Sequence, residues 1–460
     1  MYRRTLLRRA TLSVGGIVSL AGCGTSQEES MSNESSSTSP STPSPEPEDA
    51  PPETPEQYDR VVDVTKRGGD PTGEESLVPV LDRINAERTL IFLPPGRYRM
   101  DESWTVREFE RTGIVGSDAT IVPDPDTEAH LFAFISREVG TELRIEGLTF
   151  DYTHPDATGR MIHAEISDGL SVRDITARGT VARRPSLARV DITDPGGSGI
   201  VERLMLPNGA IPGSGVTGCY VGNNSRGTLT FRDCYIEGFP DNGLYADPPA
   251  GRIIVEGGQF INNGISNVRI RGNSIVRDAY VRCDGQHRDF NNMRGIRLTD
   301  FEPQEEPEPA VVDNCRVDML AVTHSDGGIE LSSQLARGVV RNTTINVDAD
   351  DVPAIRAKPP DSKLSEFDIA PWIRLEGVNI NGDASGESAV RIAERDDGIF
   401  EDLDIYQPGA DRDGMMFTRS GENVLRSSRI RVSGNPLVLN DSVVDRNDIE
   451  ERTLDGPEMD

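Results

Sequence analysis

A seven-residue pattern of apolar and polar positions recurs through most of the chain. Its second residue is apolar, its fourth is mostly Gly, Asp or Asn, and its seventh is mostly Ile, Val or Phe. The copies are RIEGLTF (144–150), SVRDITA (171–177), TFRDCYI (230–236), IVEGGQF (254–260), IVRDAYV (275–281), VVDNCRV (311–317), VVRNTTI (339–345), RLEGVNI (374–380), IFEDLDI (399–405), VLRSSRI (424–430) and VVDRNDI (443–449), with a weaker one at IVERLML (200–206). An amphipathic helix would instead repeat its apolar residues at i, i+3, i+4 and i+7. The pattern therefore predicts short strands and tight bends, repeated as the coils of a parallel β-solenoid.

A second strand is predicted in each coil, between consecutive copies of the pattern. The segments are NGLYAD (242–247), NVRIRG (267–272), GIRLTD (295–300), GIELSS (328–333), AIRAKP (354–359), AVRIAE (389–394), GMMFTR (414–419) and PLVLND (436–441). Because side chains alternate along a strand, the residues expected in the core are Leu244, Val268, Ile296, Ile329, Ile355, Val390, Met415 and Leu437. Those expected to face outward are Tyr245, Arg269, Arg297, Glu330, Arg356, Arg391, Met416 and Val438. A second outward row is expected at Asp247, Arg271, Thr299, Ser332 and Lys358.

This coil, with three strands and irregular turns, resembles the right-handed parallel β-helix of the pectate lyase superfamily. The stretch VVDVTKRGGDPTGEESLVPVLDRINAERTLIFLPPGRYRM (61–100) is also similar to the N-terminal element of polygalacturonases and pectate-lyase-like enzymes. That resemblance implies a turn at Gly69-Asp70 and a capping helix from Glu74 to about Ala86. The predicted fold class is all-β: a right-handed, single-stranded parallel β-helix over residues 59–450, closed at its first coil by the capping helix.

The N-terminal residues predict export and attachment to a membrane. Arg8-Arg9 precedes a weakly apolar run far shorter than the ~20 residues of a membrane span, and this resembles a twin-arginine signal. LAGC (20–23) resembles a lipobox, which implies a lipid on Cys23. Residues 1–23 are interpreted as the signal, 24–58 as a disordered Ser/Thr/Pro/Glu-rich tether and 451–460 as an acidic tail. We expect the protein at the outer face of the cytoplasmic membrane or outside the cell, with the lipid as its only membrane contact.

The charge of the chain limits its partners. It has 77 acidic and 48 basic residues, a formal net charge of -29. Only Lys66, Lys358 and Lys363 are lysines, so arginine is strongly preferred. With the N-terminal signals, this composition resembles exported lipoproteins of haloarchaea. Such a surface repels phosphates, so we expect no nucleic acid as partner, and we expect a monomer.

Cysteine and histidine give little evidence of a metal centre. Besides Cys23 the chain contains Cys219, Cys234, Cys283 and Cys315, without a CxxC pair. A zinc site therefore has little support. Two of these cysteines fall on core positions of the repeat. Whether any of them form a disulfide stays undecided at this point. The histidines at 130, 154, 163 and 287 are scattered, which predicts surface or turn positions.

In the middle coils the outward rows concentrate positive charge on one sheet face. The residues are Arg269, Arg271, Arg297, Arg356, Lys358 and Arg391, interrupted by Glu330. Adjacent rungs lie ~4.8 Å apart, where two like charges repel by ~1 kcal/mol even in water. Such a strip on an acidic protein suits an anionic chain such as a uronate-rich or sulfated polysaccharide, whose carboxylates match arginine forks. The loops 301–309 and 359–371 are expected to wall a groove there. A plain ion ladder, a polyanion-binding groove and a catalytic groove all fit this pattern.

The family resemblance implies one reaction in particular. Lyases of this superfamily remove the proton α to a uronate carboxyl group, with calcium or another cation neutralising that carboxylate. On this analogy Lys358 or Arg356 is the base, and Lys358 is favoured because crowding cations help lysine lose its proton. Arg269 and Arg297 would hold the carboxylate. Candidates to bind calcium or donate a proton are His324, Asp326 and Glu330, and the remaining substrate-binding candidates are Tyr245, Arg271 and Arg391.

Other activities stay open. Mannuronan-type epimerases use the same proton abstraction. Polygalacturonases need two carboxyl groups across the scissile bond; Arg356-Ala357-Lys358 loosely matches their Arg-Ile-Lys motif, but the strands at 242–247, 267–272 and 295–300 lack the paired aspartates. A surface β-helix that binds polysaccharide, or that acts as a rigid spacer, requires no catalytic residues.

Overall fold

The computed structural model describes residues 57–125, 127–183, 186–300, 306–366 and 369–454. The predicted signal, the lipid attachment site Cys23, the tether up to residue 56 and residues 455–460 lie outside the described residues. Within the described ranges, every helix is too short or too polar to cross a membrane.

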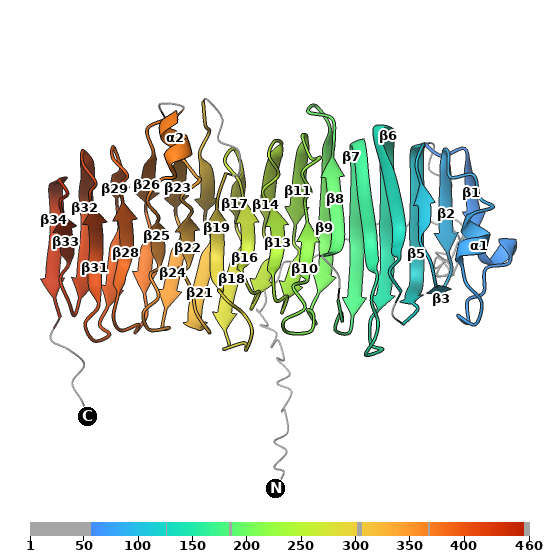
Figure 1. The fold of residues 1–460 in the computed structure, drawn as a ribbon, viewed down its shortest axis with the longest axis horizontal. Helices are drawn as coiled ribbons and strands as arrows, with labels where there is room; N and C mark the ends of the chain where they lie inside the picture. The colour runs from blue at the N-terminus through green and yellow to red at the C-terminus, as the bar shows by residue number, and fades with distance from the viewer. Residues whose placement is uncertain (1–56, 126, 184–185, 301–305, 367–368, 455–460) are drawn as a thin grey trace, which may run out of the picture. The chain divides into compact units, whose positions relative to one another are not determined.

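The described chain forms a parallel β-solenoid, as predicted. Every pair of strands that it contains runs parallel, and most strands pair with their equivalents one coil away. The coils follow one another in chain order, from β1 at the blue end to β34 at the red end (Figure 1).

Each coil contributes strands to three faces. The first face consists of β4 (Trp104–Val106), parts of β6 (His130–Asp151) and β7 (Arg160–Arg178), β8 (Ser186–Ile192), β10 (Thr217–Tyr220), β13 (Asn242–Ala246), β16 (Ser266–Ile270), β19 (Arg294–Leu298), β22 (Ile329–Leu331), β25 (Ile355–Ala357), β28 (Ser388–Ala393), β31 (Asp413–Thr418) and β33 (Leu437–Asn440). The second consists of β1 (Arg60–Asp63), β2 (Thr89–Leu93), parts of β5 (Glu110–Pro123), β6, β7 and β9 (Ser198–Leu206), then β11 (Thr228–Arg232), β14 (Arg252–Glu256), β17 (Ile275–Arg277), β20 (Ala310–Asp313), β23 (Arg337–Arg341), β26 (Trp372–Glu376), β29 (Ile399–Glu401), and parts of β32 (Asn423–Val432) and β34 (Val444–Thr453). The third consists of β3 (Gly96–Met100), β12 (Tyr235–Glu237), β15 (Gln259–Ile261), β18 (Tyr280–Asp284), β21 (Arg316–Ala321), β24 (Thr344–Val347), β27 (Asn379–Asn381), β30 (Asp404–Gln407) and the remaining parts of the long strands.

The fourth residue of the repeated pattern makes the bend between the second and third faces. In ten of the eleven strong copies its φ is positive, between 49° and 70°. These residues are Gly147, Asp174, Asp233, Gly257, Asp278, Asn314, Asn342, Gly377, Asp402 and Ser427. Gly, Asn and Asp enter this left-handed region at the lowest cost, which explains why the pattern carries them there.

The N-terminal cap is present but much shorter than predicted. The helix α1 spans Val78–Leu81, after a 3-10 turn η1 at Thr65–Arg67, and does not extend from Glu74 to about Ala86. Asp70 accepts the backbone N–H groups of Glu74 and Glu75 at 2.8 and 2.9 Å, which keeps that stretch in a turn. Pro79 has no N–H and is tolerated only in a first helical turn, so helix begins just before it. A second short helix, α2 (Ser362–Glu366), lies in the predicted loop 359–371.

The predicted core is largely confirmed. The inward residues of the first face are all buried up to Met415, and Leu437 in the last coil is half-buried. The four described cysteines are buried and free. The last strand, β34, reaches Thr453, three residues into the segment interpreted as a tail.

Candidate functional site

The predicted outward row is a single ladder on the first face. Strand pairing registers, in this order, Tyr245, Arg269, Arg297, Glu330, Arg356, Arg391, Met416 and Val438. We call the members from Tyr245 to Arg391 the outer ladder. The structure thus brings Arg269, Arg297 and Arg356 onto one face, as the alternation predicted.

The second outward row is buried except at Lys358. The strands that should carry it end one residue earlier, at Ala246, Ile270, Leu298 and Leu331, so the alternation stops and the chain turns. The row members Asp247, Arg271, Thr299 and Ser332 are buried, although β25 likewise ends one residue before Lys358. Arg271 pairs with Asp300, at 3.3 Å between Nη2 and Oδ1, and is not part of the exposed strip. The Lys358 side chain stays 25% exposed.

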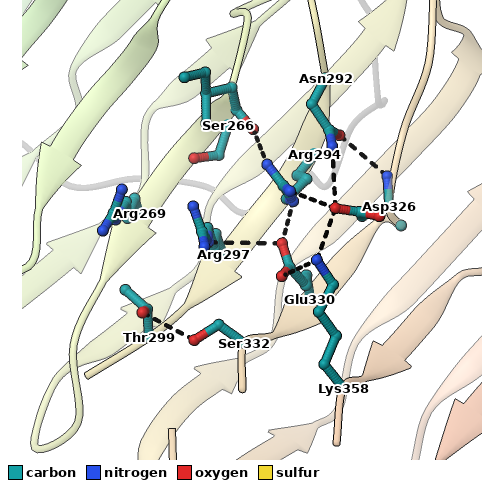
Figure 2. A network of polar contacts seen from close by, with 12 residues as sticks. Ser266, Arg269, Asn292, Arg294, Arg297, Thr299, Asp326, Glu330, Ser332 and Lys358 are labelled. Atoms are coloured by element: carbon teal, nitrogen blue, oxygen red, sulfur yellow. Dashed lines mark hydrogen bonds and ion pairs between the residues drawn. The ribbon is translucent and has the colours of Figure 1, made fainter. Parts of the chain in front are cut away.

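Three basic side chains converge on the carboxylate of Glu330 (Figure 2). Lys358 Nζ lies 2.9 Å from Oε1, Arg297 Nε lies 3.6 Å from Oε2, and Arg294 Nε also contacts Oε2. Glu330 is completely buried, and neither of its oxygens accepts an aligned hydrogen bond. Charge attraction, which tolerates poor alignment, therefore holds this carboxylate in place.

Asp326 is the second carboxylate of the site and precedes β22. It accepts hydrogen bonds from Arg356 Nη1 at 2.7 Å and Lys358 Nζ at 2.8 Å, and it also contacts Arg294. Burial by itself would raise the pKa of Asp326, but the hydrogen bond from Lys358 and the charge of Arg294 outweigh it and hold that pKa well below its usual range. We call the following residues the ion cluster: Arg294, Arg297, Asp326, Glu330, Arg356 and Lys358.

The contacts of the ion cluster bear on the predicted catalytic roles. Lys358 was favoured as a base because cations would crowd it, but its ammonium contacts the two carboxylates of Asp326 and Glu330. It is a hydrogen-bond donor there, whereas a base must be free to accept a proton. Asp326 stays ionised at neutral pH because of its lowered pKa, so it has no proton to donate as an acid. Burial lowers the pKa of Arg297, with Glu330 opposing the shift.

The proposed calcium ligands do not form a calcium site with one another. The described residues contain no group of three His, Cys, Asp or Glu side chains able to hold a metal ion. Asp326 and Glu330 are already neutralised by arginine and lysine, which a calcium ion would have to displace. His324 is exposed in the loop before β22.

A second charged ladder, on the second face, provides a comparison. On the second face, strand pairing registers Glu146, Arg173, Glu202, Arg232, Glu256, Arg277, Asp313, Arg341, Glu376, Glu401 and Arg426. We call this the alternating ladder, because acid and base alternate at every rung but one. Arg232 pairs with Glu256 at 2.9 Å and Arg426 with Glu401 at 2.6 Å, as neighbours across rungs. This is the arrangement that a purely structural ion ladder adopts.

The outer ladder departs from that arrangement. Arg269 registers with Arg297, and Arg356 registers with Arg391, so like charges occupy adjacent rungs twice. The basic residues on and beside it are Arg269, Arg294, Arg297, Arg356, Lys358 and Arg391, and the acidic residues that they contact are Asp247, Asp326, Glu330 and Glu387. Six cations against four carboxylates leave an excess of positive charge along this ladder of an acidic protein.

A cavity of about 250 Å³ opens at the C-terminal end of the outer ladder. Four basic side chains line it, from three consecutive coils: Arg356, Lys358, Arg391 and Arg419. Met416, Thr418 and Pro359 contribute the uncharged wall. We call it the cationic pocket.

Sequence reasoning missed some residues on this face. Arg294 opens β19, three residues before Arg297, and its position before the alternating stretch gave no sign that it would reach Asp326 and Glu330. Tyr220 registers with Tyr245 and extends the outer ladder by one rung. Its segment, GCYVG, has the same Gly-apolar-Tyr order as GLYAD at 243–247, which would have located it.

The prediction that the histidines are scattered surface or turn residues is wrong for two of them. His130 and His163 lie in strands of the first face, with their Nδ1 atoms 2.8 Å apart. His163 Nε2 lies 2.7 Å from Oε1 of Glu165, which is buried. Burial alone would raise the pKa of Glu165, but hydrogen bonds from His163 and Arg137 hold it well below its usual range. Because His130 and His163 come from different coils, their proximity could not be read from chain spacing.

Asp326 makes the ion cluster sensitive to acid. Its pKa is lower in the folded protein than in the unfolded chain, where it is about 3.9. The ionised carboxylate therefore stabilises the fold above that pH, and this contribution is lost as the pH falls through the folded pKa. We expect Asp326→Asn to be less stable than the wild type near pH 7, and the difference to shrink at about pH 3. Urea unfolding midpoints at both pH values test this, and an unchanged difference would contradict it.

Comparisons with known proteins add little beyond the fold. No protein-family model matches the chain, and no curated protein does. Among solved structures, the A-module of the mannuronan C-5 epimerase AlgE6 of Azotobacter vinelandii is similar at 14% identity and a TM-score of 0.45, over 78% of this chain and 98% of that one. The surface adhesin PfbA of Streptococcus pneumoniae is similar at 11% identity and a TM-score of 0.45, over 86% and 99%. A family 28 exopolygalacturonase of Yersinia enterocolitica is similar at 12% identity and a TM-score of 0.30, over 86% and 79%. At these identities and scores, none of their activities transfers to this chain.

Proposed function

We propose that the solenoid binds an acidic polysaccharide of the uronate type along the outer ladder. One observation carries this proposal: adjacent arginines occupy neighbouring rungs of the outer ladder twice, whereas the alternating ladder on the second face alternates acid and base at every rung but one and has no adjacent arginines. Adjacent arginines repel by about 1 kcal/mol per contact even in water, a cost that an anionic ligand would reverse. A linear polyanion, with charges repeated along its length, matches a row of cations repeated along the solenoid.

Binding is better supported than catalysis. The β-elimination suggested by the family resemblance needs a free base, and Lys358 is engaged by two carboxylates. A hydrolase needs a protonated acid, and the lowered pKa of Asp326 works against that role. Arg356, the other candidate base for lysis or epimerisation, also donates a hydrogen bond to a carboxylate, that of Asp326.

The location of the protein belongs to the same proposal. A polysaccharide ligand would be met outside the cell, which agrees with the twin-arginine signal and with lipid attachment at Cys23 as inferred from the sequence. The exported, lipid-anchored monomer stays a prediction, since residues 1–56 lie outside the described residues.

Affinity and activity assays with the same polymers test the proposal. The protein would be passed over immobilised uronate polymers, a sulfated polymer and a neutral glucan, and then incubated with each polymer with and without calcium. We expect retention on the acidic polymers that weakens as salt is raised, because exposed charges are screened. An equal affinity for the neutral glucan, or no retention on any acidic polymer, would contradict the proposal. Ultraviolet absorbance of an unsaturated product would add a lyase activity, and new reducing ends without absorbance would add a hydrolase activity.

A further inference from the structure

The cationic pocket differs from the rest of the outer ladder in the hydrogen-bond donors that it leaves unused. We infer that it is a subsite for one anionic sugar residue, whose oxyanion is held between Arg356 and Arg391. This inference rests on the proposed function and specifies which part of the face recognises the ligand's charged group.

Arg356 and Arg391 have matching positions and matching spare donors. They are registered neighbours on β25 and β28, and both line the pocket. Arg356 uses Nη1 on Asp326, and Arg391 uses Nη1 on Glu387. Among the described residues, neither has a hydrogen-bond partner for Nε or Nη2. Each guanidinium thus keeps one edge able to make two parallel hydrogen bonds to an oxyanion.

The other two arginines of the outer ladder do not line the cationic pocket. Arg269 directs both Nε and Nη2 at Asp247, and its guanidinium carbon lies 4.3 Å from the ring centre of Tyr245. Arg297 is mostly buried, and its Nε lies 3.6 Å from the Glu330 carboxylate without an aligned hydrogen bond. Within this row, Arg356 and Arg391 are therefore the arginines that combine spare donors with a place in the wall of the cationic pocket.

The uncharged wall of the pocket indicates what carries the oxyanion. Met416 follows Arg391 in the ladder register and leaves the row without charge from that rung onward. Pro359 lies exposed at the other side of the pocket, next to Lys358. A sugar ring has apolar C–H faces as well as an acidic substituent, so it can contact Met416 and Pro359 while its oxyanion meets the two arginines. A free phosphate or sulfate ion would leave that wall without contacts.

Binding of short oligosaccharides to matched arginine variants tests the inference. The probes are a triuronate, a sulfated trisaccharide of equal length and a neutral trisaccharide, measured by calorimetry with the full chain. The variants are Arg391→Gln and, as control, Arg426→Gln on the alternating ladder, where the arginine is similarly exposed and paired with Glu401. We expect Arg391→Gln to weaken triuronate binding by at least tenfold and Arg426→Gln to change it by less than twofold.

The outcomes separate the subsite from the proposed function. If the triuronate binds the wild type but both variants bind equally, the subsite is wrong and polymer binding elsewhere on the ladder stands. If the wild type binds the triuronate and not the sulfated trisaccharide, the oxyanion in the subsite is a carboxylate. If it binds the sulfated trisaccharide and not the triuronate, the oxyanion is a sulfate ester. Arg391→Lys keeps the charge but loses the fork, so full affinity in that variant would overturn the paired-donor geometry. No binding to any acidic probe would overturn both proposals.

Discussion

Replacing Glu330 by glutamine is expected to lower the free energy of unfolding by about 3–4 kcal/mol, because it leaves buried cations without their counter-charge. Glu330 is fully buried and contacts Arg294, Arg297 and Lys358. Glutamine keeps nearly the same volume, so the loss would come from charge and not from a cavity. Equilibrium unfolding in urea measures the difference.

Glu401→Gln is the matched control for this prediction. Glu401 also pairs with an arginine, Arg426, but both side chains are substantially exposed. Exposed ion pairs contribute ~0–1 kcal/mol, so the control should stay close to the wild type. The double variant Glu330→Gln/Arg297→Gln should recover part of the loss, since it removes one of the unpaired cations. Equal effects of Glu330→Gln and Glu401→Gln would show that the cluster is no more than a surface ion pair.

Replacing Arg395 by methionine should cost about 3 kcal/mol and also disturb the site. Arg395 is completely buried and has no carboxylate partner among the residues that the structure describes, and burial lowers its pKa to about 10. Its guanidinium donates to the carbonyls of Ser332, Leu335, Ala336 and Lys358, at 2.9 to 3.2 Å. Buried carbonyls that lose their donor cost about 1–3 kcal/mol each, and removing the buried charge of Arg395 offsets part of that loss. The same bonds fix the turn after β22 and the backbone of Lys358, next to the cationic pocket.

The expected readouts are a lower urea midpoint and weaker binding of the acidic polymer. Arg429→Met serves as control because the Arg429 side chain is 62% exposed, and it should change stability by less than about 0.5 kcal/mol. If Arg395→Met unfolds at the urea midpoint of the wild type, the hydrogen bonds from the Arg395 guanidinium to the four carbonyls do not stabilise the fold.

The fold could be predicted because each coil repeats the same local physics. Bend residues such as Asp278 and Asn342 have a positive φ, which Gly, Asn and Asp adopt at the lowest cost. The same residue types therefore recur at the bend of each coil, and this recurrence can be recognised in the sequence. Alternation within a strand then placed Arg269 and Arg356 on one face. The capping helix was overestimated, since Pro79 and the Asp70 turn limit it to one turn.

The chemistry of the site depended on features that alternation does not encode. The strands end one residue before Arg271, Thr299 and Lys358 alike, yet Arg271 and Thr299 are buried and Lys358 remains partly exposed. Asp326 comes from a loop, and its contacts with Lys358 and Arg356 depend on how that loop returns to the strand. The environment of Lys358 was therefore predicted with the wrong sign: carboxylates surround it where cations were expected.

Arginine labelling tests the central claim, that an acidic polymer lies along the outer ladder, most directly. The protein would be treated with an arginine-specific dicarbonyl reagent, with and without a uronate polymer, and the modified residues would be quantified by mass spectrometry. Arg356 and Arg391 on the first face are compared with Arg341 and Arg426 on the second, which are similarly accessible. We predict that the polymer protects Arg356 and Arg391 and leaves the other two unchanged; equal labelling of all four with and without polymer, or protection confined to Arg341 and Arg426, would contradict the account.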